Sequence, residues 1–102
     1  MSRYLIKMTY LEGRHKGATY FLKKGGYVVG NQKYFLYSDT YNDERTVKSV
    51  CTKMRKNNEL NREIERKDND CRIAKGMEGK KYFIYNRCSY EPYELSDDMR
   101  VR

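Results

Sequence analysis

Two short aromatic runs do most to limit the folds open to this chain. The first is Lys33–Tyr37, and the second, nearly identical, is Lys81–Tyr85. Aromatic residues favour β-strands, and alternate side chains of a strand point to opposite faces. Because both faces of each run would be apolar, we expect two central strands of one sheet. The sequences flanking the two runs differ, so we interpret them as converged strands and not as a duplicated unit.

An amphipathic helix is predicted between the two runs. Four apolar residues follow the i, i+3, i+4, i+7 spacing of one helical face: Val47, Val50, Cys51 and Met54. Thr40 or Asn42 would cap the start of this helix. Asp43 and Glu44 would then lie in its first turn, where the helix dipole favours anions.

The helical pattern weakens beyond this apolar face. We expect the helix to end at the pair Asn57 and Asn58. Leu60 and Ile64 are out of phase with the preceding face, which favours a bend, or a second short helix over Glu59–Arg66, above one long helix. A loop, a strand, a hairpin loop and a partner strand are predicted next, in this order: Lys67–Asp70, Cys71–Lys75, Gly76–Gly79 and Lys80–Arg87.

An antiparallel hairpin is predicted near the start of the chain. Tyr4–Leu11 has the alternation of a strand, and four of its residues share one face: Tyr4, Ile6, Met8 and Tyr10. Ala18–Lys23 would be the partner strand, and Tyr27–Val29 resumes an extended run. Glycines on either side permit a turn, whose tip carries Arg14, His15 and Lys16.

These elements predict an α+β fold. It would consist of a single, mostly antiparallel β-sheet with one amphipathic helix, and a short second helix, packed on one face. A length of 102 residues leaves room for one domain with one core. We assign that domain to residues 1–95 and expect residues 96–102 to form a mobile tail.

The chain is basic, and its basic residues are unevenly distributed. Its net charge is +8, and residues 1–36 hold seven basic residues against one acidic residue. Such an excess favours contact with nucleic acid or with acidic protein surfaces. No apolar stretch has the length of a membrane span, so we expect no membrane partner. The odd number of widely spaced cysteines favours reduced thiols in a cytoplasmic protein.

Catalysis is not indicated by any motif. His15 is the sole histidine, and no glycine pattern matches a phosphate-binding loop. A zinc site would need His15 together with cysteines that lack the close spacing of structural zinc ligands. Lys80–Tyr85 does not match the RNA-recognition motif, because the small residue between the aromatics is missing. We therefore expect a protein that is not an enzyme and needs no cofactor.

Nine basic residues are candidates for contact with a partner. They lie on the outer face of the predicted helix, at the hairpin tip and beside the aromatic runs: Arg45, Lys48, Arg55, Lys56, Arg14, Lys16, Lys33, Lys80 and Lys81. A charged helix face is often merely solvated, and a hairpin tip is often a solvent-facing turn. If the rings of the two aromatic runs are exposed, they would suit stacking with unpaired bases. Packing in the core or across strands is the commoner role of such rings. We expect binding on the helix face and the hairpin tip.

Two classes of function remain after these exclusions. The first is a small binding protein whose basic surface contacts nucleic acid at its phosphates, with little readout of sequence. The alternative is a protein-interaction module or small inhibitor that docks on a cytoplasmic nucleic-acid enzyme. Phage-encoded anti-CRISPR proteins are similar to this chain in their small size and in having no recognisable catalytic site. A homodimer formed through a sheet edge is a third arrangement.

Overall fold

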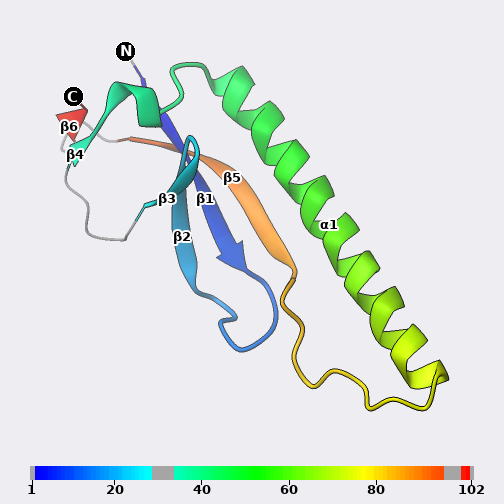
Figure 1. The fold of residues 1–102 in the computed structure, drawn as a ribbon. Coiled ribbons are helices and arrows are strands. Elements are labelled where there is room, and N and C mark those ends of the chain that lie inside the picture. Colours follow the sequence, from blue (N-terminus) through cyan, green and yellow to red (C-terminus); the bar gives the residue numbers. More distant parts are fainter. Residues whose placement is uncertain (1, 29–33, 96–99, 102) are drawn as a thin grey trace.

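The protein has an α+β fold, in which one long helix lies beside an antiparallel sheet (Figure 1). The computed structural model describes residues 2–28, 34–95 and 100–101. Within these residues the elements, in chain order, are β1 (Tyr4–Tyr10), β2 (Thr19–Lys23), β3 (Gly26–Val28), β4 (Tyr34–Phe35), the 3-10 turn η1 (Tyr37–Asp39), α1 (Glu44–Ala74), β5 (Cys88–Glu94) and β6 (Arg100–Val101). The main sheet has the order β3-β2-β1-β5, and β4 pairs separately with β6.

The predicted N-terminal hairpin is confirmed. β1 and β2 are antiparallel, with Ile6 opposite Leu22 and Met8 opposite Tyr20. The turn requires two glycines, because Gly13 and Gly17 have φ values of 85° and 88°, which other residues rarely adopt. This hairpin places the apolar faces of β1 and β2 on the same side of the sheet.

Strand β5 was not predicted, although it completes the main sheet. It pairs with β1 along its full length, from Tyr4 opposite Glu94 to Tyr10 opposite Cys88. Its sequence contains Pro92, which a strand tolerates when it lies at the edge of a sheet. No strand was predicted beyond Arg87, because this segment contains a proline and two glutamates, which are uncommon in strands. Pairing with β1 therefore decides its conformation.

The core lies between the sheet and the first half of α1. Its buried residues come from both layers, and partly buried Val50 and Met54 pack against them: Ile6, Met8, Leu22, Tyr41, Val47, Cys51 and Cys88. The predicted apolar face of the helix is thus confirmed. A smaller cluster of Leu5, Leu95, Phe21 and Tyr93 occupies the other face of the sheet. Both faces of β1 are therefore covered near its start.

The helix begins one residue later than the predicted caps allow. Asp43 is the N-cap, and its carboxylate accepts hydrogen bonds from the Arg45 N–H at 3.1 Å and the Thr46 hydroxyl at 2.9 Å. These two hydrogen bonds lower the pKa of Asp43, that from Thr46 contributing most. Thr40 is instead buried, and its hydroxyl accepts a hydrogen bond from Arg3 Nε at 2.8 Å. Neither Thr40 nor Asn42 caps the helix.

Helix α1 continues through the predicted break, so that prediction is wrong. Glu59–Arg66 is part of the same helix and not a second one, and the predicted loop and strand that follow also lie in it, up to Ala74. Asn58 does not end the helix because its side chain is used elsewhere. Its Nδ2 donates to the Asn86 carbonyl at 3.0 Å, and its Oδ1 accepts from the Cys88 N–H at 3.2 Å.

A glycine ends the helix instead. Gly76 has a φ of 76°, and its N–H donates to the Ile73 carbonyl at 3.0 Å. The Met77 N–H donates to the Arg72 carbonyl at 2.9 Å, which completes a Schellman motif. The predicted hairpin loop at this position is therefore a helix end. Residues 76–87, which we call the return segment, then run back toward the sheet (Figure 1).

The two aromatic runs are not strands of the main sheet, in contrast to the prediction. Lys81–Tyr85 lies in the return segment and has no strand partner among the described residues. In the first run, Tyr34–Phe35 forms β4, which pairs with β6 outside the main sheet, whereas Lys33 lies outside the described residues. Aromatic residues favour a strand only where a neighbouring strand is available for pairing. In the main sheet, β5 already pairs with the side of β1 that β2 leaves open.

The predicted mobile tail is described only at two positions. Arg100–Val101 forms β6, which runs parallel to β4. Residues 96–99 and 102 lie outside the described part of the chain. The mobility of the tail therefore stays a prediction.

Replacement of Ile6 by alanine should strongly destabilise the protein. Ile6 is fully buried against the helix, so we expect the free energy of unfolding to fall by about 2–5 kcal/mol. Ile64→Ala is the matched control, because Ile64 is exposed on α1, and a change within about 0.5 kcal/mol is expected. Urea denaturation followed by circular dichroism measures both. Equal effects of the two substitutions would contradict the core described here.

Candidate nucleic-acid interface

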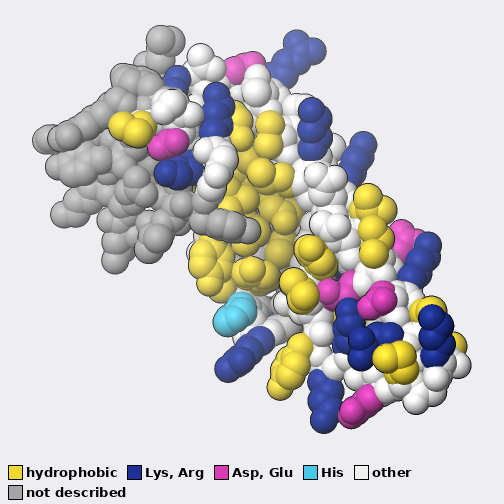
Figure 2. All heavy atoms as spheres, viewed as in Figure 1, with side chains coloured by type: hydrophobic (Ala, Val, Ile, Leu, Met, Phe, Trp, Pro, Cys, Tyr) yellow, Lys and Arg dark blue, Asp and Glu magenta, His cyan; other side chains and the backbone are white. Residues whose placement is uncertain are grey.

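The outer side of α1 carries a row of exposed basic residues. At 100° per residue, they lie about 80° to 180° around the helix from buried Val47: Arg45, Lys48, Arg55 and Lys56. Figure 2 shows lysine and arginine side chains projecting along this outer edge of the helix. We call these four residues the basic face. All four are exposed in the structure, and their role in binding stays a prediction.

Positive charge is concentrated in the first half of the helix. Residues 44–58 contain five basic residues and one acidic residue, whereas residues 59–75 contain five of each. The acidic residue in the first half, Glu44, forms an ion pair with Lys48 at 3.1 Å. Both side chains are well exposed, so this pair leaves Lys48 free to exchange partners at little cost. An approaching polyanion would therefore meet net positive charge only along the first half.

The hairpin tip presents two further basic candidates, Arg14 and Lys16, and both are exposed. The tip does not join the basic face. Gly13 lies against the return segment, where a Cβ atom on it would come within 2.7 Å of the Asn86 side chain. The tip is thus held beside the second half of the helix.

The lysines of the return segment are also separate from the basic face. Lys80 forms an ion pair with Asp68 at 2.9 Å, and its N–H donates to Asn69 Oδ1 at 2.6 Å. Asn69 is thirteen residues beyond Lys56, which corresponds to about 20 Å along the helix. Lys81 is exposed next to Lys80. The nine predicted residues therefore do not form one patch, and Lys33 lies outside the described residues.

The second aromatic run is exposed, which differs from the core packing that sequence analysis favoured. Tyr82 and Ile84 have exposed fractions of 82% and 79%, and Phe83 and Tyr85 are also exposed. The run has no regular secondary structure, because the helix beside it offers side chains and not a strand edge. The alternative in which the rings are open to a partner thus fits this run. Side chains of the first run lie mostly outside the described residues.

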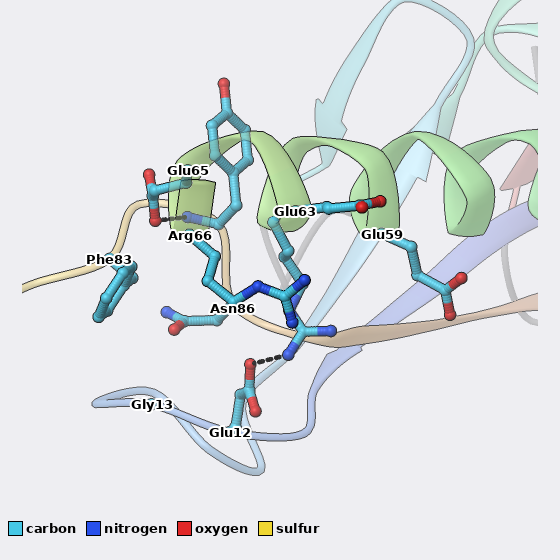
Figure 3. A pocket seen from close by; sticks show the side chains of 10 residues that line it. Glu12, Gly13, Glu59, Glu63, Glu65, Arg66, Phe83 and Asn86 are labelled. Atoms are coloured by element: carbon cyan, nitrogen blue, oxygen red, sulfur yellow. Dashed lines mark hydrogen bonds and ion pairs between the residues drawn. The ribbon is translucent and has the colours of Figure 1, made fainter. Parts of the chain in front are cut away.

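A charged groove lies between the hairpin tip, α1 and the return segment (Figure 3). Its volume is about 580 Å³. Glu12 Oε1 accepts hydrogen bonds from Arg62 at 2.8 Å and from the Arg87 N–H at 2.9 Å, which joins these three parts of the chain. Buried Glu65 accepts a longer hydrogen bond, of 3.4 Å, from the Tyr85 N–H. These carboxylates hold the return segment and leave the groove unsuited to phosphate.

A second groove, of about 450 Å³, lies on the other side of residues 84–86. It runs between the sheet and α1, and its lining residues are uncharged: Met8, Tyr10, Leu22, Met54, Asn57, Asn58, Asn61, Ile84, Tyr85, Asn86, Cys88 and Tyr90. We call it the amide groove. Sequence analysis missed it because its residues come from four separate segments. The pair Asn57 and Asn61, four residues apart in a helix, is the one local signal.

The cysteines are free thiols in this structure: Cys51 and Cys88 are buried, and Cys71 is exposed. Burial raises the pKa of Cys51 and of Cys88, which keeps both in the neutral thiol form. Neutral buried thiols are poor nucleophiles and act here as core residues. Within the described part of the chain, no group of three potential ligands is arranged to hold a metal ion.

Comparisons with protein-family models, with curated proteins and with solved structures find no match to this chain. In the part of the chain that the structure describes, no helix is both long and apolar enough to cross a bilayer.

The contact made by Glu12 should make stability depend on pH. Hydrogen bonding by the Arg87 N–H, aided by the charge of Arg62, holds the pKa of Glu12 below its usual value of 4.5. A pKa that is lower in the folded state means that the ionised carboxylate stabilises the protein when the pH is above the usual pKa. This stabilisation is lost as the pH falls through the folded-state pKa. We expect Glu12→Gln to lower thermal stability at neutral pH, and the difference from the wild type to shrink at about pH 3.

Glu59→Gln is the control for this measurement, since Glu59 lines the same groove without a hydrogen bond among the described residues. Melting temperatures followed by circular dichroism across the acidic range compare the three proteins. If Glu12→Gln lowers the melting temperature by the same amount at every pH, the charge of the carboxylate does not join the hairpin tip, α1 and the return segment.

Proposed function

We propose that this protein is a small, non-enzymatic binding protein that contacts nucleic acid through the basic face of α1. One observation carries the proposal. Arg45, Lys48, Arg55 and Lys56 are all exposed on one side of one helix, in a half with a net charge of +4. Such a surface attracts phosphate and releases counterions when it binds.

The dimensions of the basic face suit a nucleic-acid backbone. Arg45 and Lys56 are eleven residues apart, which is about 16 Å along the helix axis. That distance spans several phosphates, since one strand of a duplex carries a charge about every 3.4 Å. Contacts from lysine and arginine to phosphate fix position but carry no information about sequence. We therefore propose binding with little sequence readout by this face.

The proposal includes a cytoplasmic location. Three free thiols, one of them exposed Cys71, support a reducing compartment. The exposed hairpin-tip residues Arg14 and Lys16 would supply secondary contacts to a long nucleic acid, because they lie beyond the basic face.

Affinity for duplex DNA should fall steeply with salt, and Arg55→Gln/Lys56→Gln should weaken it. Each phosphate contact contributes about 0.9 to the slope of log affinity against log salt, so this double variant should lower the slope by about 2. Fluorescence anisotropy with a labelled duplex, over a series of salt concentrations, measures the slope.

Arg66→Gln/Lys75→Gln is the matched control, because it removes the same charge from the neutral second half of the helix. It should leave the slope nearly unchanged. Absence of binding to single- or double-stranded DNA or RNA at low salt would contradict the proposed function. An equal loss in both double variants would show that total charge matters and the basic face does not.

A second candidate function is a protein-interaction module, favoured by apolar residues on the second half of α1. Leu60 and Ile64 are one turn apart and more than half exposed, and Tyr82 and Ile84 of the return segment are exposed as well. Apolar and tyrosine side chains often anchor protein interfaces. The partner would be a nucleic-acid-handling protein, which the chain would inhibit in the manner of a phage-encoded anti-CRISPR protein.

A pull-down from cell lysate distinguishes the two candidate functions. A protein partner should remain bound after nuclease treatment and be lost with Leu60→Ser/Ile64→Ser. Leu11→Ser is the control, since Leu11 is also exposed but lies at the hairpin. Loss of all partners after nuclease treatment would contradict the interaction module.

A homodimer formed through a sheet edge can be tested by light scattering on the purified chain. The edge strands of the main sheet are β3 and β5.

A further inference from the structure

The amide groove is uncharged in a highly charged protein. Lys, Arg, Asp and Glu make up 35% of the chain, yet the described residues that line this groove include none of them. The neighbouring groove of Figure 3 is lined by six charged residues. A neutral groove does not attract phosphate or ammonium groups. Its chemistry suits a neutral ligand with apolar faces and polar edges.

Two carboxamides of α1 in the groove are available to such a ligand, whereas the Asn86 side chain lies against Gly13. Asn58 is occupied, because both ends of its side-chain amide are hydrogen-bonded to the backbone of residues 86 and 88. Asn57 and Asn61 also line the groove, and within the described part of the chain neither side chain is hydrogen-bonded. They lie one helical turn apart and so face the same side of α1. Each offers a donor and an acceptor side by side.

The remaining walls supply apolar and aromatic surface. Tyr10, Tyr85 and Tyr90 line the groove together with Met8 and Met54. Tyr10 is held edge-on to Tyr20, with ring centroids 5.8 Å apart, which fixes one wall. Tyr85 and Asn57 are exposed, so the groove opens to solvent on their side. Aromatic rings beside carboxamides are the combination that proteins use to hold unpaired bases.

A cation lies next to the groove on the same helix. Lys53 is exposed and precedes Asn57 by one turn, so it lies between the amide groove and the basic face around the helix. A base in the groove would carry a phosphate toward the mouth of the groove. Lys53 is placed to meet that phosphate, and a nucleic-acid strand can then continue onto the basic face.

We propose that the amide groove binds one unpaired nucleobase of a single-stranded nucleic acid, with adenine preferred. This inference rests on the proposed function and adds a base-selective site to it. Asn57 and Asn61 would bind the polar edge of the base, since a carboxamide matches the N6 and N7 atoms of adenine. Tyr85 would stack on its face. A paired base is excluded, because its faces are covered by the neighbouring base pairs.

Adenosine tests the groove without any contribution from phosphate. Titration of the ¹⁵N-labelled protein should shift the side-chain amide signals of Asn57 and Asn61 in NMR spectra. Signals of Asn42 and Asn69, which lie away from the groove, should stay in place. Unchanged signals of Asn57 and Asn61 at saturating adenosine would overturn the inference, whether or not the protein binds nucleic acid.

Asn57→Leu/Asn61→Leu tests the same site in a nucleic acid. Affinity for a short oligoadenylate should fall about tenfold or more, and affinity for duplex DNA should stay the same. Asn42→Leu is the matched control, and circular dichroism checks that each variant keeps its helix. An equal loss for both probes, or no loss for oligoadenylate, would overturn the base site and leave phosphate binding standing. If the wild type binds neither oligoadenylate nor duplex DNA, the proposed function fails. The adenosine titration then shows by itself whether the amide groove binds a base.

Discussion

The contact between β1 and the first half of α1 is the constraint on which the rest of the structure depends. Ile6 and Met8 from the strand pack against Val47 and Cys51 from the helix, and all four are buried. The backbone groups of Tyr4 and Tyr41 also bond to each other in both directions, at 2.7 and 2.9 Å. The helix is therefore attached to the sheet both by apolar packing and by a β-bridge just before it begins.

The length of the helix creates the other surfaces. At 1.5 Å per residue, 31 residues extend about 46 Å, whereas the seven residues of β5 cover about 23 Å. The second half of α1 thus passes beyond the sheet. Its inner side is polar, and it meets the return segment through Glu65 and Asn69, next to the contact that Asn58 makes at the end of the first half. Hydrogen bonds between side chains and backbone hold the two segments farther apart than close apolar packing would. The two grooves lie in the gaps that remain beside the return segment.

Local patterns predicted the parts of the fold that local physics decides. The hairpin follows from alternation and two turn glycines, and the Val47–Met54 face follows from helical spacing. The exposure of the basic face was predictable for the same reason. The helix end was not, because Asn58 looks like a stop signal until its partners, thirty residues away, are known. β5 was missed because its conformation is imposed by β1. The amide groove combines four segments, and its one local signal in the sequence is the pair Asn57 and Asn61.

The two surfaces would contribute differently to binding. Under the proposed function, the basic face would supply affinity for any nucleic acid, since phosphate is the same at every position. That affinity alone cannot distinguish a single strand from a duplex of the same charge. The amide groove has no charge to add, but its carboxamides and rings would reach base edges and faces that a duplex hides. Because Lys53 lies between the two surfaces, one strand would occupy both at once in the proposed arrangement. A base held in the groove would then fix where the phosphates meet the helix, and so convert general attraction into binding at a defined position along the strand.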